Sequence, residues 1–182
     1  MPVDFRILAR RASRIAGQEP KVEWRRNSQR VKRTIRQAVV IAKKHGVAIP
    51  ADVVFFQAEP GDLEGAWEDL FPDRGMETAR GPVVFEHPDG YVYWQDHYNR
   101  FGKIPFLVHP DVLSSDEAIV AVFEHEMFEL SRLREVFLSS AECRMTATDY
   151  GLQVATNRPG NFHDQAWEAA DEIFLQMRRG KQ

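Results

Sequence analysis

The sequence predicts an α+β domain in which a small mixed or antiparallel sheet of three to four strands packs on one long helix and a C-terminal helix. The first observation is an uninterrupted helical pattern of apolar residues over 114–138, and the second is a similar pattern over 162–178. The third is a set of short runs rich in Val, Phe and Tyr, bounded by turn residues, at 52–57, 82–86, 91–94 and 104–108.

The composition is that of a globular protein without membrane spans. The chain has 182 residues, of which 43% are hydrophobic and 28% charged. No apolar run approaches the roughly 18 residues of a transmembrane helix, and the first residues lack the apolar core of a secretory signal. The one cysteine, Cys143, fits a reducing compartment, so we expect a cytoplasmic location.

The N-terminal region is strongly basic. Residues 1–46 hold 13 lysines and arginines against three acidic residues, a net charge of +10, whereas residues 47–182 carry −13. Residues 4–16 have helical spacing, and the polar stretch 18–27 is typical of a linker, so we expect an arm over 1–27 and one domain over 28–182. The arm either docks on the acidic body or contacts nucleic acid, a membrane or a partner.

The first half of the domain should alternate between helix and strand. Ser28 is expected to cap a helix that stops at Gly46, and 52–57 is expected to be a buried strand. The acidic, turn-rich stretch 59–81 is expected to be irregular. A hairpin should then join 82–86 to 91–94, because Asp89-Gly90 is a strong turn signal.

The run 104–108 should form a strand at the edge of the sheet. Its Pro105 lacks a backbone N–H, and a proline is tolerated most easily at an edge. His109-Pro110-Asp111 ends this strand and leads into the long helix.

The long helix 114–138 carries a polar group where an apolar one is expected. Ser114 and Glu117 have the spacing of a capping box at its start. With successive residues about 100° apart, Glu126 falls inside the apolar stripe, where a carboxylate is unfavourable unless another group compensates it. His125 and Glu129 lie one turn apart at the margin of the stripe.

The C-terminal part consists of an irregular stretch and a last helix. Residues 139–160 are expected to be irregular, with a short element near 145–150. Asn161 should cap the helix 162–178, which places His163 and Asp164 in its first turn.

The spacing His125-x-x-x-Glu129 predicts a metal site. On a helix it places an imidazole and a carboxylate on one face, where both can bind one divalent ion. His163 is the best third ligand, and Asp164 is an alternative ligand or a partner that orients a histidine. Glu126 would then be the general base that takes a proton from water.

The segment from about residue 90 to 137 resembles the zincin-like metallopeptidases, through its strand, short turn, capped helix and His125-Glu126-x-x-Glu129. The resemblance implies a peptide substrate aligned along the edge strand, with contacts at Phe106, Val108 and His109. It also implies a zinc ion, although Glu129 replaces the usual second histidine and could favour manganese or iron. The stretch Asn161-Phe-His-Asp-Gln-Ala-Trp167 is similar to segments of bacterial toxins and phage-associated proteins.

Other interpretations remain open. The chain could be an inactive interaction module on a zincin-like scaffold, or a nucleic-acid-associated protein that uses residues 1–46. At residue level, His125 and Glu129 could form an ordinary side-chain pair, and three aromatic residues are expected in the core, namely Phe123, Trp94 and Trp167.

Overall fold

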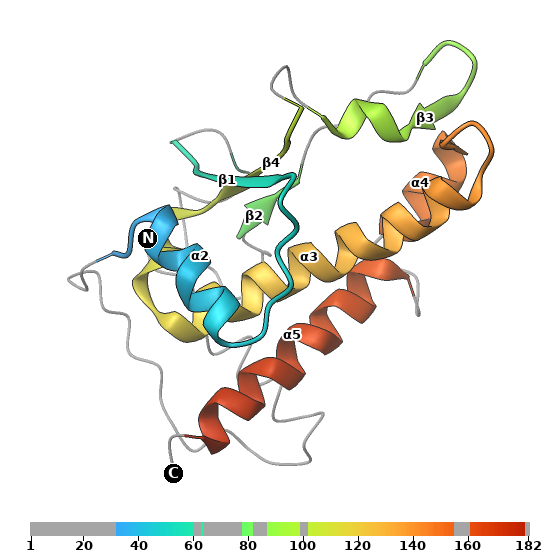
Figure 1. Cartoon of the computed structure of the whole chain (residues 1–182). Helices are drawn as coiled ribbons and strands as arrows, with labels where there is room; N and C mark the ends of the chain where they lie inside the picture. Colours follow the sequence, from blue (N-terminus) through green and yellow to red (C-terminus); the bar gives the residue numbers. More distant parts are fainter. Residues whose placement is uncertain are drawn as a thin grey trace.

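The computed structural model describes residues 32–59, 63, 78–81, 87–98, 102–154 and 161–180. In these ranges the protein is α+β, as predicted (Figure 1). A three-stranded sheet has the order β1 (Val53–Gln57), β4 (Ile104–Val108), β2 (Ala79–Arg80), with β1 parallel and β2 antiparallel to β4. A mixed sheet of this size is therefore confirmed for the part of the chain that is described.

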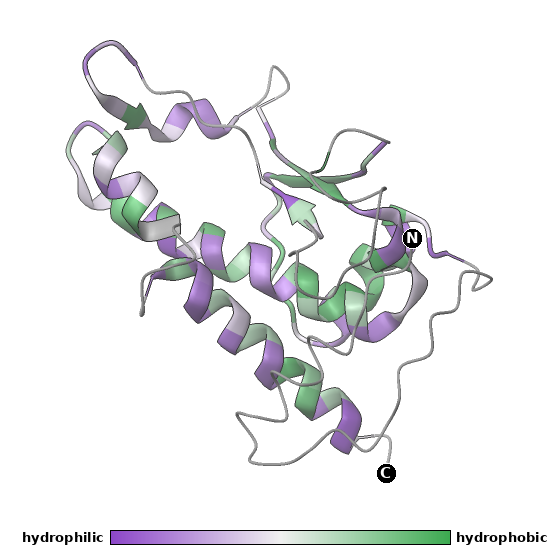
Figure 2. Cartoon of the chain, turned by 180° about the vertical axis from the view of Figure 1, so that it is seen from behind, coloured by the Kyte–Doolittle hydropathy of each residue, from purple (hydrophilic) through white to green (hydrophobic). Residues whose placement is uncertain are grey.

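The long helix α3 (Asp116–Ser139) organises the fold. On one side it meets the sheet, where the ring of Phe123 stacks on Phe55 of β1 with a centroid distance of 4.1 Å. On its other side α5 (Phe162–Arg179) runs antiparallel along it, and α2 (Ile35–Lys44) packs beside its first half (Figure 1). Figure 2 shows that β1, β4 and the first half of α3 are mostly apolar, whereas α5 alternates between polar and apolar residues. The core therefore lies around the first half of α3.

The prediction that 104–108 is an edge strand is wrong. All five residues of β4 pair with β1, and Leu107 and Val108 pair with β2 on the other side. Pro105 is tolerated here because the backbone nitrogens of successive residues in β4 point to opposite sides of the strand. Ile104 donates to Asp52 on the β1 side (2.8 Å), so the nitrogen of Pro105 points to the opposite side, before the residues that pair with β2.

The predicted start of the first domain helix is also wrong. α2 begins at Ile35, because Thr34 and Gln37 form a capping box in which Gln37 N donates to Thr34 Oγ1 (3.2 Å) and Thr34 N donates to Gln37 Oε1 (2.9 Å). Residue 33 is held outside the helix, since Arg33 N donates to Leu113 O (2.8 Å). Ser28 lies outside the described residues.

The cap of α3 is one residue later than predicted. Ser115 is the N-cap, and its hydroxyl accepts from Ala118 N (3.1 Å). Ser114 instead ends a short 3₁₀ helix, η2 (Pro110–Ser114), where its hydroxyl donates to Asp111 O (2.6 Å). The 3₁₀ turn before the helix shifts the N-cap by one position. The Ser-x-x-Glu spacing of a capping box does not reveal such a turn.

A second, two-stranded sheet lies beyond the first. β3 (Tyr91–Tyr93) pairs antiparallel with β5 (Arg144–Thr146), and it is followed by the 3₁₀ helix η1 (Trp94–His97). The turn at 87–91 is confirmed by two bonds, Gly90 N to His87 O (2.8 Å) and His87 N to Tyr91 O (3.0 Å), with Gly90 at φ +79. The first arm of the predicted hairpin, 82–86, lies outside the described residues.

Much of the predicted irregular sequence near the C-terminus is ordered. Residues 144–154 form β5 and then α4 (Ala147–Val154), which includes the short element expected near 145–150. The predicted last helix and its Asn161 cap are confirmed, because the Asn161 side chain accepts from Asp164 N (2.7 Å). The arm over 1–27 and most of 59–81 lie outside the described residues.

The described end of the basic region is paired with acidic residues. Lys32 Nζ lies 3.2 Å from Asp111 Oδ1, and Arg33 lies 2.7 Å from Asp116 Oδ1. The Arg33 guanidinium also donates to Ser114 O (2.6 Å). These two cations therefore bind the segment that leads into α3, as expected if the basic region docks on the acidic body.

Candidate metal centre

Two groups of the candidate centre come from α3. His125 and Glu129 project from one face of the helix, one turn apart, because the helix is unbroken between them. The Nε2 atom of His125 lies 3.6 Å from Oε2 of Glu129. His125 is 3% exposed, so its imidazole is enclosed by the packing of α3 against its neighbours.

The third group comes from α5. The Asn161 cap starts α5 immediately before His163, and the antiparallel packing places this first turn against the middle of α3. The Nδ1 atom of His163 lies 4.0 Å from Oε1 of Glu129, and its ring is edge-on to that of His125 with a centroid distance of 4.8 Å. The three predicted ligands, 38 residues apart at most, are therefore brought together.

The three side chains lie close enough together that a movement of about one ångström would let them hold one divalent ion. One potential ligand atom from each of His125, Glu129 and His163 lies within 4.8 Å of the other two. Ligand atoms about 2.1 Å from a tetrahedral ion are about 3.4 Å apart. Two imidazoles and a carboxylate are also a donor set that zinc and other divalent transition metals accept. Within the described residues no second group of this kind occurs.

The electrostatics of the centre also favour a cation. Burial raises the pKa of the Glu129 carboxyl to about 7, since its charged form is poorly solvated. Burial also raises the pKa of Tyr150 to about 12, and the charge of Glu129 adds to this shift, so Tyr150 lies within electrostatic reach of that carboxylate. A bound cation would stabilise the ionised form of Glu129.

The other predicted site residues have different surroundings. Glu126 follows His125 on α3 and is 7% exposed. Asp164 lies in the first turn of α5 beside His163, but it is not part of the three-residue group. The three-residue group includes neither carboxylate, so the roles of Glu126 and Asp164 stay predictions.

The three residues expected to contact a substrate are core residues. Phe106, Val108 and His109 are 3%, 0% and 0% exposed. The Phe106 ring packs against Phe55 at 5.5 Å, and Nδ1 of His109 accepts a hydrogen bond from Asp111 N (3.0 Å). β4 is also paired on both sides. The three residues are therefore buried and do not line an open strand edge that could bind a peptide.

Sequence reasoning missed one aromatic residue of the centre. Trp167, expected as a core residue, packs its ring on His125 at a centroid distance of 4.2 Å. Its indole N–H donates to Nε2 of His163 (3.1 Å). The signal in the sequence was the spacing of four residues between His163 and Trp167, which places both on one face of α5.

Comparisons with protein-family models, curated proteins and solved structures found no match to this chain. Among the described helices, none combines the length and the apolar content needed to cross a bilayer. The chemistry of the centre therefore has to be inferred from its own residues: a partly buried carboxylate and two imidazoles that could hold one metal ion.

Proposed function

We propose that the protein is a metal-dependent hydrolase, a zincin-like peptidase in which His125, Glu129 and His163 hold one divalent ion. The observation that carries the proposal is the convergence of these three side chains from two packed helices, within 4.8 Å of one another. The order of residues in His125-Glu126-x-x-Glu129 supports the peptidase assignment by resemblance.

Glu126 is proposed as the general base. It lies about 100° around the helix axis from His125, on the flank of the ligand-bearing face. When bound, a divalent ion supplies Lewis acidity, which polarises a carbonyl group and makes water more acidic. The Glu126 carboxylate would accept a proton from the attacking water and then donate it to the leaving amine as the peptide bond breaks.

Zinc is the proposed metal, with manganese or iron as alternatives. Two imidazoles suit zinc, and the carboxylate of Glu129 makes the donor set harder than three nitrogens would. To decide between them, the purified protein is incubated with a mixture of zinc, manganese and iron ions, and its metal content is measured after dialysis.

The metal site is tested by binding. Isothermal titration of the metal-free protein with Zn²⁺ should give one site, and His125→Ala or Glu129→Ala should weaken it at least about tenfold, because each removes one of three ligands. His45→Ala is the matched control, since His45 is exposed at the end of α2. Equal affinity in wild type and His125→Ala would disprove the site.

The hydrolytic role is tested separately. With zinc loaded, wild-type protein should cleave members of a quenched fluorescent peptide library, and Glu126→Gln should lower the rate by about a hundredfold or more while zinc stays bound. Glu135→Gln is the control, because Glu135 is an exposed residue of α3 that pairs with Arg132. Full activity of Glu126→Gln would remove the general-base assignment and leave the metal site intact.

A second candidate function is a non-enzymatic module that uses the ion to fasten α5 to α3. The position of β4 in the middle of its sheet favours this candidate, because a peptide cannot add to β4 where β1 already pairs with it. The deep burial of His125 and Glu126 is also typical of a closed structural site. Zinc binding without any peptide cleavage would support the module over the peptidase.

A further inference from the structure

Trp167 contacts both histidines of the candidate centre. Its ring packs on His125 at 4.2 Å, and its N–H donates to Nε2 of His163 at 3.1 Å. We propose that this hydrogen bond and metal binding by His163 exclude each other, so that Trp167 is a positioning residue that metal entry must displace. The proposal rests on the metal site proposed above.

The exclusion follows from the chemistry of imidazole. A neutral ring has one N–H and one nitrogen lone pair, and the Trp167 N–H takes that lone pair at Nε2. A metal at Nε2 would need the same lone pair. A metal at Nδ1 would need the lone pair there, which moves the proton to Nε2, where it can no longer accept from Trp167. Either way the hydrogen bond is lost.

The fold holds the metal-free arrangement in place. His163 and Trp167 lie one turn apart on α5, and α5 packs along α3, so the indole lies between its own helix and His125. With Nε2 accepting, the proton of His163 is on Nδ1, the atom that lies 4.0 Å from Oε1 of Glu129. In the metal-free protein, the His163 nitrogen that faces Glu129 is therefore a protonated Nδ1, which has no lone pair to offer a metal ion.

Two consequences follow. Metal binding must offset the loss of one hydrogen bond, which lowers the apparent affinity by about twofold to tenfold. The environment of the Trp167 N–H must also change when metal enters. Trp167 is therefore both a modulator of affinity and a reporter of loading.

The first test observes the hydrogen bond in the wild-type chain of 21.0 kDa by NMR. Long-range proton–nitrogen spectra of the metal-free protein should show His163 with its proton on Nδ1, and Zn²⁺ should change this pattern. The indole N–H signal absent from a Trp167→Phe spectrum identifies Trp167, and this signal should shift upfield in wild type as Zn²⁺ is added. The chain has four tryptophans, so the assignment needs few variants.

The second test measures affinity. Trp167→Phe keeps an aromatic ring against His125 but removes the N–H donor, so Zn²⁺ affinity should rise about twofold to tenfold. Trp94→Phe is the matched control, because Trp94 is a buried tryptophan that packs on another histidine, His97, with a centroid distance of 4.8 Å. Its Zn²⁺ affinity should equal that of wild type.

The outcomes separate this inference from the proposed function. Zinc binding that depends on His125, together with an unchanged Trp167 signal and unchanged affinity in Trp167→Phe, overturns the inference and leaves the metal site standing. Absence of zinc binding in wild type overturns both. If Trp167→Phe does not fold, the wild-type spectra decide alone: if none of the four indole N–H signals shifts at saturating Zn²⁺, the exclusion is refuted.

Discussion

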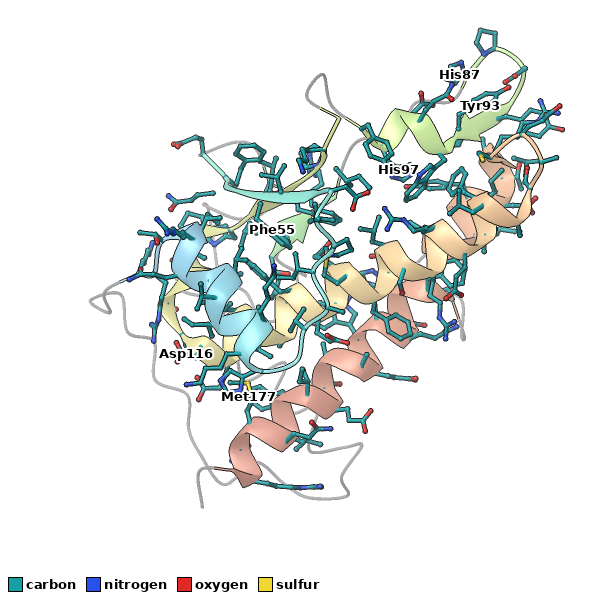
Figure 3. All side chains as sticks on the ribbon, in the orientation of Figure 1. Phe55, His87, Tyr93, His97, Asp116 and Met177 are labelled. Atoms are coloured by element: carbon teal, nitrogen blue, oxygen red, sulfur yellow. The ribbon has the colours of Figure 1, made fainter. Side chains whose placement is uncertain are left out.

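His97 is a buried imidazole that lies among aromatic rings. It projects from η1 toward α3 (Figure 3), with centroid distances of 4.8 Å to Trp94 and 5.4 Å to Phe137, and it is 2% exposed. Among the described residues, neither of its nitrogens has a hydrogen-bond partner. Burial lowers the pKa of His97 from 6.5 to about 4, although the negative charge of Asp96 partly opposes this shift.

The depressed pKa of His97 predicts acid sensitivity. Between pH 6.5 and 4 the unfolded chain binds a proton at His97 and the folded chain does not, so stability is full above pH 6.5 and falls as the pH drops toward 4. The loss attributable to this residue is about 3 kcal/mol. Urea unfolding of wild type and His97→Phe at pH 7 and pH 4.5 measures it, and the variant should lose less stability on acidification.

The control for His97 is His45→Phe, at an exposed position. Its stability should follow the wild-type pH dependence. An identical acid loss in wild type and His97→Phe would mean that other groups, and not His97, cause the sensitivity.

At the scale of the elements, the start of α3 is held by the segment before α2. Arg33 makes three contacts there: its backbone N–H donates to Leu113 O (2.8 Å), and its guanidinium binds Ser114 O (2.6 Å) and Asp116 (2.7 Å). A planar guanidinium can bridge a carbonyl and a carboxylate, which a lysine cannot do with one ammonium group. Arg33 thus links α2 to the N-terminus of the helix that carries His125 and Glu129.

Arg33→Ala is expected to lower the free energy of unfolding by about 1–2 kcal/mol, because one charged hydrogen bond and one ion pair are lost but the site is partly exposed. Arg33→Lys should lose an intermediate amount. The control is Arg36→Ala, at an exposed position of α2, which should change stability by less than about 0.5 kcal/mol. Denaturant unfolding checks all three, and equal stability of Arg33→Ala and wild type would exclude the link.

Helices were more predictable than strand pairing, for a physical reason. The periodicity around Glu126 and the Asn161 cap are local signals, and they located α3 and α5 to within two residues. The pairing of β1 with β4 joins residues about fifty positions apart, such as Val53 and Ile104, and no local pattern encodes it. Pro105 wrongly indicated an edge strand. The sequence shows that its N–H is missing, but not which side of the strand its nitrogen faces.

The candidate centre was predictable for the same reason, but incompletely. His125 and Glu129 are fixed by helical spacing, and His163 by its place in the first turn of a capped helix. The contact of Trp167 with both histidines depends on how α5 packs along α3, which is a property of the tertiary structure. From the sequence, Trp167 was expected only as an aromatic core residue.

At the scale of the whole molecule, the candidate centre joins two parts of the fold. The sheet and α2 pack on α3, while α5 lies on its other side and contributes only His163 to the three-residue group (Figure 1). An ion held by all three residues would connect α5 to the rest of the protein. Because such a site exists only when α3 and α5 are packed, metal binding must stabilise the folded state.

Zinc should therefore raise the melting temperature. At a free Zn²⁺ concentration about 100 times Kd the folded state gains about 2.7 kcal/mol, which for a domain of this size is a shift of about 5–10 °C. His125→Ala should remove the shift, whereas His45→Ala should keep it, since His45 is exposed at the end of α2. Differential scanning calorimetry with and without Zn²⁺ measures the shift. A shift of equal size in His125→Ala would place the stabilising ion elsewhere, and wild type without any shift would mean that α3 and α5 are not joined by metal.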